Sequence, residues 1–348
     1  MASENIKHER IEQVIEQLTR RKLEHSRQLL KSIKSPYTGN RDKIRSRLKA
    51  AYLADKIDVE RLKQLLQELD TWGQQRIRIG HLEEDVLNEL NSTDSITGKA
   101  KRSGMEKILD GIVDFVPPEQ LTPMVIDYSE ESGRRILRVV AAKTRQLWTA
   151  ISDLPEIEFR RVFNILDNVD PALIEKYADV IYKPFKKETQ KAIDFAEIDL
   201  DTGFTLVSTT LIRRGNSYSA EFEEFYKVFD PFITLRNLKP VQLFDANGQI
   251  YRLPLEEVKV LAHNLLTDVG GSLRSNKADI RSDQQLHSAH SNLLDAPKPY
   301  CNCEWQTCPD LDEVVHTHVY APAGEISILG QVTEKSVRYV LRKITNLA

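Results

Sequence analysis

Cysteine and histidine side chains gather near the C-terminal end of the chain. Seven of the eleven Cys and His residues in the sequence fall between His287 and His318. Thiolates and imidazoles in a loop-rich region suit tetrahedral zinc, which would stabilise a segment too poor in apolar residues to fold by burial alone. His287 and His290 would be bystanders on a short helix. The predicted ligands of this structural zinc site are Cys301, Cys303 and Cys308 with one histidine, His316 or His318.

The same residues permit a second interpretation, because side chains two positions apart on a strand share a face. Cys301 with Cys303, and His316 with His318, would then belong to two polar-faced strands. The cysteines would be reduced thiols in an edge strand, and the histidines would be solvated.

Two other strings contain residue types found in active sites. Asp201-Thr202-Gly203 matches the short signature of aspartic proteases, in which two carboxylates share a proton. Asp245 with Glu257 and Lys259 is similar to the carboxylates and lysine of metal-dependent nucleases. Both strings have ordinary explanations, because Asp, Thr and Gly are common in turns and acidic residues are favoured at the start of a helix. The sequence therefore does not support catalysis.

Basic side chains are concentrated between Gln17 and Lys49. This segment holds eleven basic and two acidic residues, a net charge of +9, so the rest of the chain carries −12 of the total of −3. A segregated basic surface is typical of a polyanion-binding protein, because each Lys or Arg along a phosphate backbone releases a counterion. The predicted nucleic-acid-binding residues are Arg20, Arg21, Lys22, Arg27, Lys31, Lys34, Arg41, Lys43, Arg45, Arg47 and Lys49.

The second half of this segment has a characteristic spacing of glycine, basic and aliphatic residues. It runs from Gly39 to Leu48 as Gly-Asn-Arg-Asp-Lys-Ile-Arg-Ser-Arg-Leu and follows the apolar residues Leu29, Leu30 and Ile33. Residues 29–48, about twenty of 348, resemble the SAP motif, a short helix-turn-helix that binds DNA. The chain departs from that motif upstream, where Ser35-Pro36-Tyr37 replaces the usual glycine-leucine pair.

The residues of this stretch have roles that agree with the resemblance. Gly39 permits a positive φ in the turn, and Ile44 and Leu48 lie one helical turn apart on a buried face. The remaining basic side chains are then free to meet phosphates. They are Arg41, Lys43, Arg45 and Arg47.

The composition is that of a folded protein with room for two or three domains. Hydrophobic residues make up 41% and charged residues 29% of the 348. No run of about eighteen apolar residues exists, and the chain opens directly into a charged segment. We therefore expect no membrane contact and an intracellular location, cytoplasmic or nuclear, to which the odd number of cysteines also points.

Helical periodicity dominates the first half of the sequence. Apolar residues recur at helical spacing in 11–18, 59–69 and 82–90, and the polar, aperiodic stretch 91–104 predicts a flexible linker. Further helices are predicted at 105–115, 134–151, 156–166 and 172–182, although 134–142 alone could also be a strand.

Strand-like patterns begin near residue 195. The β-branched run 204–212 predicts a strand, and 241–253 predicts a hairpin around Asn247-Gly248. The remaining predictions are a helix at 254–266, a long loop at 269–299, a strand at 325–330 and a helix at 334–344.

Together these patterns predict an α+β protein with a mainly helical N-terminal half. The expected parts are a basic, SAP-like helical head at 1–90, the linker at 91–104, a helical segment at 105–195, and an α+β domain at 196–348 with the long loop and the Cys/His cluster. The predicted function is a non-catalytic DNA- or RNA-binding or adaptor protein whose C-terminal body contacts other proteins. The alternative is a nucleic-acid-processing, nuclease-like enzyme with its site in the C-terminal domain.

Overall fold

The structure of the protein is a computed structural model. It describes residues 11–12, 14–113, 116–131, 133–150, 185–211, 218–265, 271–275, 279–291 and 296–348. The predicted helices at 156–166 and 172–182 lie outside the described residues.

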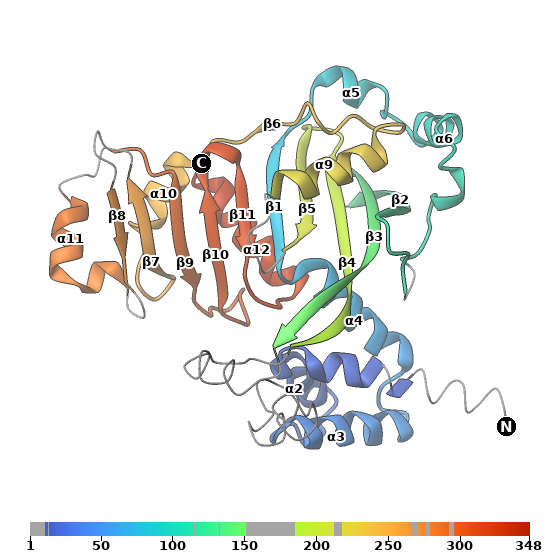
Figure 1. Cartoon of the computed structure of the whole chain (residues 1–348), viewed down its shortest axis with the longest axis horizontal. Helices are drawn as coiled ribbons and strands as arrows, with labels where there is room; N and C mark the ends of the chain where they lie inside the picture. The colour runs from blue at the N-terminus through green and yellow to red at the C-terminus, as the bar shows by residue number, and fades with distance from the viewer. Residues whose placement is uncertain are drawn as a thin grey trace, which may run out of the picture.

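Most described strands form one antiparallel sheet in the order β2-β3-β4-β5-β1-β11-β10-β9-β7-β8, with β6 paired to β1 (Figure 1). The strands are β1 (Gln75–His81), β2 (Thr122–Glu131), β3 (Arg134–Ala150), β4 (Phe185–Asp199), β5 (Phe204–Thr210), β6 (Lys239–Pro240), β7 (Val258–Leu265), β8 (Gly271–Arg274), β9 (Tyr300–Trp305), β10 (Val315–Tyr320) and β11 (Glu325–Ile328). The α-helices are α2 (Leu23–Ser32), α3 (Arg41–Leu53), α4 (Val59–Trp72), α5 (Glu84–Asn88), α6 (Thr93–Arg102), α9 (Tyr218–Phe229), α10 (Phe244–Ile250), α11 (Gln284–Ser291) and α12 (Glu334–Asn346). Short 3₁₀ turns lie at Glu106–Ile108, Ile280–Ser282 and Ala321–Ala323. The α+β class is therefore confirmed.

The head is a small helical unit that lies beside the ends of strands β3 and β4 (Figure 1). Helices α2, α3 and α4 enclose a core that includes Leu30, Leu48 and Leu62, all without solvent exposure. Asn40 and Asp58 cap α3 and α4 by accepting hydrogen bonds from the backbone N–H groups of Lys43 and Arg61. These helices follow the amphipathic periodicity seen in the sequence.

The head ends earlier than predicted. After Trp72 the chain enters β1, which lies inside the sheet between β5 and β11. The predicted linker 91–104 is largely helix α6, whose Ile96 and Ala100 pack in the core of the body. Ser92 and Ser95 form a capping box at its start. This helix was missed because its other side chains are mostly polar and give little periodic signal.

The predicted helical segment 105–195 is wrong, because its described part is mostly strand. Strands β2, β3 and β4 form a meander, and Val139, Val140, Ala141 and Ala142 are all buried. Alternate residues of β3 face two different cores, one beneath α9 and one that includes Trp72. A strand buried on both faces has a continuous apolar run, which periodicity cannot distinguish from a buried helix.

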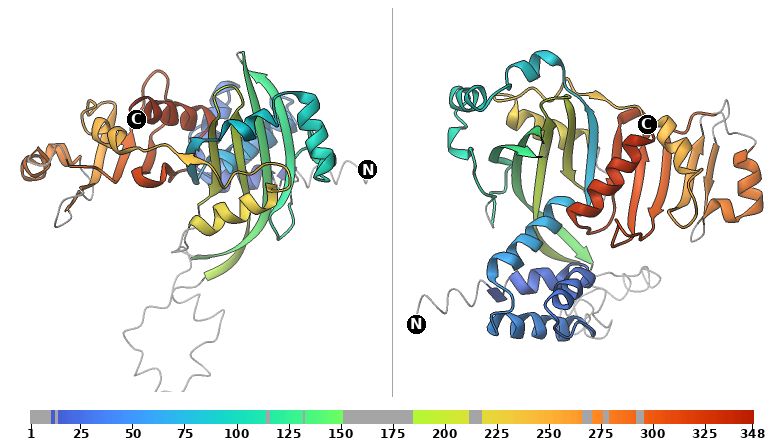
Figure 2. Two further views of the ribbon diagram at one scale, coloured as in Figure 1. Left: turned by 90° about the horizontal axis from the view of Figure 1, so that it is seen from above. Right: turned by 180° about the vertical axis from the view of Figure 1, so that it is seen from behind.

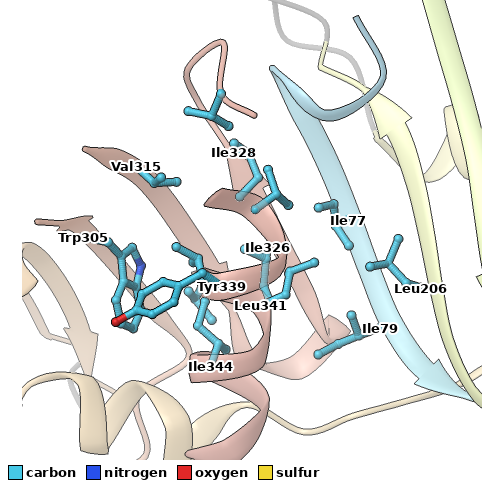
Figure 3. Packing of buried hydrophobic residues seen from close by; sticks show 14 of the residues in the cluster. Ile77, Ile79, Leu206, Trp305, Val315, Ile326, Ile328, Tyr339, Leu341 and Ile344 are labelled. Carbon is cyan, nitrogen blue, oxygen red and sulfur yellow. The ribbon is translucent and has the colours of Figure 1, made fainter. Parts of the chain in front are cut away.

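Two helices cover opposite faces of the two halves of the sheet. Helix α9 packs on the β2–β5 half in Figure 1, whereas α12 lies in front of β10 and β11 when the molecule is seen from behind in Figure 2. Figure 3 shows the core beneath α12, where Tyr339 and Ile344 meet Trp305 and Ile326. The opposite face of β7 to β11 has no described helix upon it.

In the C-terminal part, some predicted elements are of the wrong type and others are confirmed. Residues 244–250 form α10 in place of the predicted hairpin, because Leu243, Ala246 and Ile250 share one buried helical face. The predicted helix 254–266 is largely strand β7, and the predicted loop 269–299 includes β8 and α11. The strand at 204–210 and the C-terminal strand and helix, β11 and α12, are confirmed.

Candidate nucleic-acid interface

Helices α2 and α3 form a helix-turn-helix around Gly39. The φ angle of this glycine is +127°, and a Cβ atom there would lie 3.0 Å from Cδ of Lys43. Ile44 and Leu48 are completely buried on the inner face of α3. The three local expectations, a turn glycine with positive φ and two buried aliphatic residues, are therefore confirmed.

Two of the predicted binding residues hold the turn together. Arg27 donates a hydrogen bond of 2.9 Å from Nη2 to the carbonyl of Gly39, and Arg47 donates one to the carbonyl of Thr38. These contacts satisfy carbonyl groups that the turn leaves outside the helices. Arg27 and Arg47 are thus half-buried positioning residues in addition to being cations.

Within the described part of the chain, acidic side chains neutralise five of the eleven basic residues. Arg21 makes a 2.5 Å ion pair with Asp70, and Lys22 lies 3.5 Å from Glu313 of the body. The other three pairs are Arg20 with Glu16, Arg27 with Glu24, and Lys49 with Glu12. These cations are less available to phosphates than the sequence suggested.

The remaining exposed cations lie on both sides of the turn. Lys31 and Lys34 lie at the end of α2, and Arg41 and Lys43 lie at the start of α3. All four are exposed, and the structure shows no ion pair for any of them within its described residues. We call these four residues the basic turn. Tyr37, 41% exposed, lies among them with its ring 5.9 Å from Nζ of Lys31.

The head is joined to the body by buried polar contacts. Nε2 of His25, a buried residue, donates a 2.9 Å hydrogen bond to the carbonyl of Gln331, and the side chain of Gln331 accepts one of 2.7 Å from the N–H of Lys22. Glu313 lies beside this joint and accepts hydrogen bonds from Thr333. The basic turn is therefore presented by a head that is fixed to the sheet.

The predicted zinc ligands do not come together. Cys301 and Cys303 lie on β9 with their side chains buried in the core, whereas His316 and His318 lie on β10 and point to the opposite face of the sheet. Cys303 approaches Thr317 at 3.2 Å, and Cys308 contacts the Tyr339 hydroxyl at 3.5 Å. The described residues contain no group of three or more Cys, His, Asp or Glu that could hold a metal ion.

The two-strand interpretation is correct in that each pair of residues lies on one face of a strand, but the prediction of an edge strand is wrong, because β9 lies inside the sheet between β10 and β7. Buried and partly exposed residues alternate along β9 and β10. Burial raises the pKa of the Cys301 thiol well above its usual value, and a hydrogen bond with Cys303 acts in the same direction. A protonated thiol is a poor zinc ligand, so the chemistry agrees with the geometry.

The enzyme-like strings also have structural roles. Asp201 lies in the turn between β4 and β5, where it accepts hydrogen bonds of 2.9 and 2.7 Å from the backbone and Nε of Arg135. Gly203 in the same turn has a φ of +74°. Glu257 forms a 2.7 Å ion pair with Lys343 of α12. These contacts give Asp201 and Glu257 structural roles.

The structure brings together four ring side chains that sequence reasoning did not connect. Tyr251 stacks on His290 with ring centroids 3.5 Å apart, and Nδ1 of His263 lies 3.0 Å from Nε2 of His290. The Tyr251 hydroxyl lies 2.9 Å from Nδ1 of His287. His263 is also the cross-strand neighbour of Cys301. One signal in the sequence could have indicated this cluster: His263 lies in the apolar strand β7, and a buried histidine needs a polar partner.

Burial keeps the two central imidazoles neutral. Burial, with the charges of His290 and Lys298, lowers the pKa of His263 to about 3, and burial with Lys298 and His287 lowers that of His290 to about 4. Among the described residues, Nδ1 of His290 has no hydrogen-bond partner. The pair is thus a neutral, buried element of the core.

No helix in the described part of the chain is long and apolar enough to cross a membrane. Comparison with protein-family models and with curated proteins finds no match to this chain.

Proposed function

We propose that the protein is a non-catalytic nucleic-acid-binding protein whose head contacts the phosphate backbone through the basic turn. One observation carries this proposal: four exposed cations, for which the described residues provide no acidic partner, flank a turn built on Gly39 in a helix-turn-helix that is hydrogen-bonded to the body. The resemblance of residues 29–48 to the SAP motif supports DNA as the ligand. The body would serve as a scaffold and would meet protein partners.

The electrostatics of the chain favour binding at this end of the molecule. The segment Gln17–Lys49 carries +9 and the remainder −12, so the head attracts a phosphate backbone more strongly than the rest of the chain taken as a whole. The N–H groups in the first turn of α3, next to Arg41 and Lys43, are also favourable neighbours for a phosphate. The four exposed cations of the basic turn can make about four phosphate contacts.

The test compares two quadruple variants of equal charge change. One replaces the basic turn, Lys31, Lys34, Arg41 and Lys43, with Gln, and the control replaces Lys101, Lys107, Lys227 and Lys335, four exposed lysines of the body, with Gln. We expect the first variant to lose duplex binding at moderate salt in a gel-shift assay and the control to retain it, because only the first loses phosphate contacts. Equal binding by both variants, with circular dichroism unchanged, would overturn the proposal.

The same preparation separates this function from a nuclease. Labelled DNA incubated with the wild-type protein and Mg²⁺ or Zn²⁺ should remain intact, since a metal-dependent nuclease needs carboxylates converging on a metal ion. Cleavage that disappears when Asp245 or Glu257 is replaced would favour the enzyme alternative.

A further inference from the structure

One face of the sheet's C-terminal half is polar and aromatic and carries no described helix (Figure 1). The strand register places its side chains in rows across the strands. The first row is Ser272, Asn264, Tyr300, Tyr320, Glu325 and Arg78. The second row is Arg274, Ala262, Asn302, His318, Ser327 and Arg76. We call this surface the aromatic face.

Three rings form the centre of the aromatic face. Tyr300 has its ring centroid 5.1 Å from that of Tyr320 and 5.5 Å from that of His318. All three are partly exposed, although large aromatic side chains on a sheet usually turn to the core. Burial, with the charge of His316, lowers the pKa of His318 to about 4, so this imidazole is a neutral ring at pH 7.

Arginine side chains flank these rings. The guanidinium of Arg76 lies over the ring of Tyr320, 3.6 Å from its centroid, and is fixed there by Glu325 through a 2.7 Å hydrogen bond. Arg78 is held by the same carboxylate at 2.7 Å, and it marks the limit of the open face, because its guanidinium lies over Phe222 of α9. Arg274, at the outer edge, is exposed, and no acidic partner for it appears in the described structure. A stacked, anchored arginine extends the planar surface that the tyrosines provide.

The aromatic face is hollowed and carries excess positive charge. An open hollow of about 580 Å³ is lined by Tyr300, His318, Tyr320, Arg76 and Asn264, with Pro299 and Pro322 at its rim. Across the part of the face that no described helix covers lie three basic side chains, Arg76, Arg274 and Lys259, and two acidic ones, Glu304 and Glu325. The hollow therefore offers planar rings, amide groups and positive charge to one ligand.

We propose that the aromatic face binds an unpaired nucleic-acid strand, with bases stacked on Tyr300, His318 and Tyr320 and the backbone near Arg274. Exposed rings on an antiparallel sheet, bordered by arginine, provide what unpaired bases need: π surfaces for stacking and cations for phosphates. A duplex cannot use this surface in the same way, because its bases are already stacked and paired. This surface is separate from the basic turn and does not depend on it.

The experiment measures the affinity of the full chain for labelled oligothymidylate. Replacing Tyr300 with Leu keeps an apolar side chain but removes the stacking ring, so we expect affinity to fall about tenfold or more. Replacing Tyr300 with Phe keeps the ring and should keep the affinity. The matched control is Tyr128→Leu, which removes a partly exposed tyrosine from β2, at the other end of the sheet.

A second variant, Arg274→Gln, tests the same site without altering a ring. It should remove about one phosphate contact. The slope of the logarithm of the binding constant for oligothymidylate against the logarithm of the salt concentration should therefore become less negative by about 0.7. Duplex binding should be unchanged by the Tyr300 and Arg274 substitutions, whereas replacement of the basic turn with Gln should reduce duplex binding and leave most oligothymidylate binding intact. The failure of one surface is therefore distinguishable from the failure of the other.

Three results would overturn this proposal. The first is wild-type oligothymidylate affinity in the Tyr300→Leu and Arg274→Gln variants. The second is an equal loss of affinity in Tyr300→Leu and Tyr128→Leu. The third is displacement of the oligothymidylate by thymidine monophosphate when both are present at the same concentration of nucleotides. That result would show that the site binds a single nucleotide and not a strand.

Discussion

His263 and His290 are two buried imidazoles that share one hydrogen bond, and their neutrality has a consequence for stability. Their pKa values of about 3 and about 4 lie below the usual value of about 6.5. Between pH 6.5 and these values, the unfolded chain binds protons that the folded chain does not. The free energy of unfolding therefore falls as the pH falls below 6.5, by about 1.4 kcal/mol per pH unit for each proton.

Replacing His290 with Phe should reduce this acid sensitivity. The variant keeps a ring that can stack on Tyr251 and removes one group that must gain a proton on unfolding. We expect the difference in melting temperature between pH 7.5 and pH 5 to be smaller in the variant than in the wild type. Identical pH profiles for the two proteins would contradict the assignment of a neutral buried imidazole.

Gly39 is the residue on which the turn of the head depends. Its φ of +127° is strained for any other residue, and a Cβ there would contact Lys43 at 3.0 to 3.1 Å. Gly39→Ala should therefore destabilise the head by about 1–3 kcal/mol and weaken duplex binding. The matched control is Gly98→Ala in α6, where the new Cβ meets only Nη1 of Arg102 at 3.5 Å. In urea denaturation, the control should have the stability of the wild type or be more stable by up to about 1 kcal/mol. A Gly98→Ala variant less stable than Gly39→Ala would contradict the turn geometry.

At the scale of elements, amphipathic patterns predicted the type of an element correctly, whereas the type of an element buried on both faces could not be decided from its pattern. Helices α4 and α12 and strand β5 were predictable, because the helices have one apolar face and β5 is rich in β-branched residues. For strand β3 the sequence favoured a helix and left a strand at 134–142 as the alternative, because a strand buried on both faces lacks a periodic signal. Helix α10 was predicted as a hairpin because of its Asn-Gly pair. The turn around Gly39 was predictable, because only glycine suits that backbone, whereas the pairing of its neighbouring cations with distant acids depends on the tertiary structure.

Helix α6 supplies a prediction that contrasts with a flexible linker. Lys99 is paired with Glu89, and Ile96 and Ala100 are buried, so the backbone around Lys101 and Arg102 is held in a packed helix. Trypsin cleaves extended, mobile segments, and we expect it to spare this helix under native conditions. Early accumulation of an N-terminal fragment of about 100 residues would show that α6 opens readily.

At the scale of the whole molecule, positive charge is concentrated in the head, and hydrogen bonds join the head to the body. The basic head is fixed to the loops beside β10 and β11 through His25 and Gln331, and the same strands carry the aromatic face on their uncovered side. The prediction of a metal site from composition is wrong, because side chains alternate between the two faces along β9 and β10. Cys301 and Cys303 therefore lie on one face of the sheet, and His316 and His318 lie on the other. Composition can show that residues are close in sequence, but only the sheet decides which of them share a face.

The central claim is that phosphate contacts at the basic turn provide the binding. The most direct measurement is the affinity for a short DNA duplex as a function of salt concentration, for the wild type and for the variant with Gln at Lys31, Lys34, Arg41 and Lys43. With about four phosphate contacts, the logarithm of the binding constant should fall with the logarithm of the salt concentration with a slope of about −3 to −4 in the wild type and close to zero in the variant. A wild-type slope near zero, or the same slope in both proteins, would contradict the account.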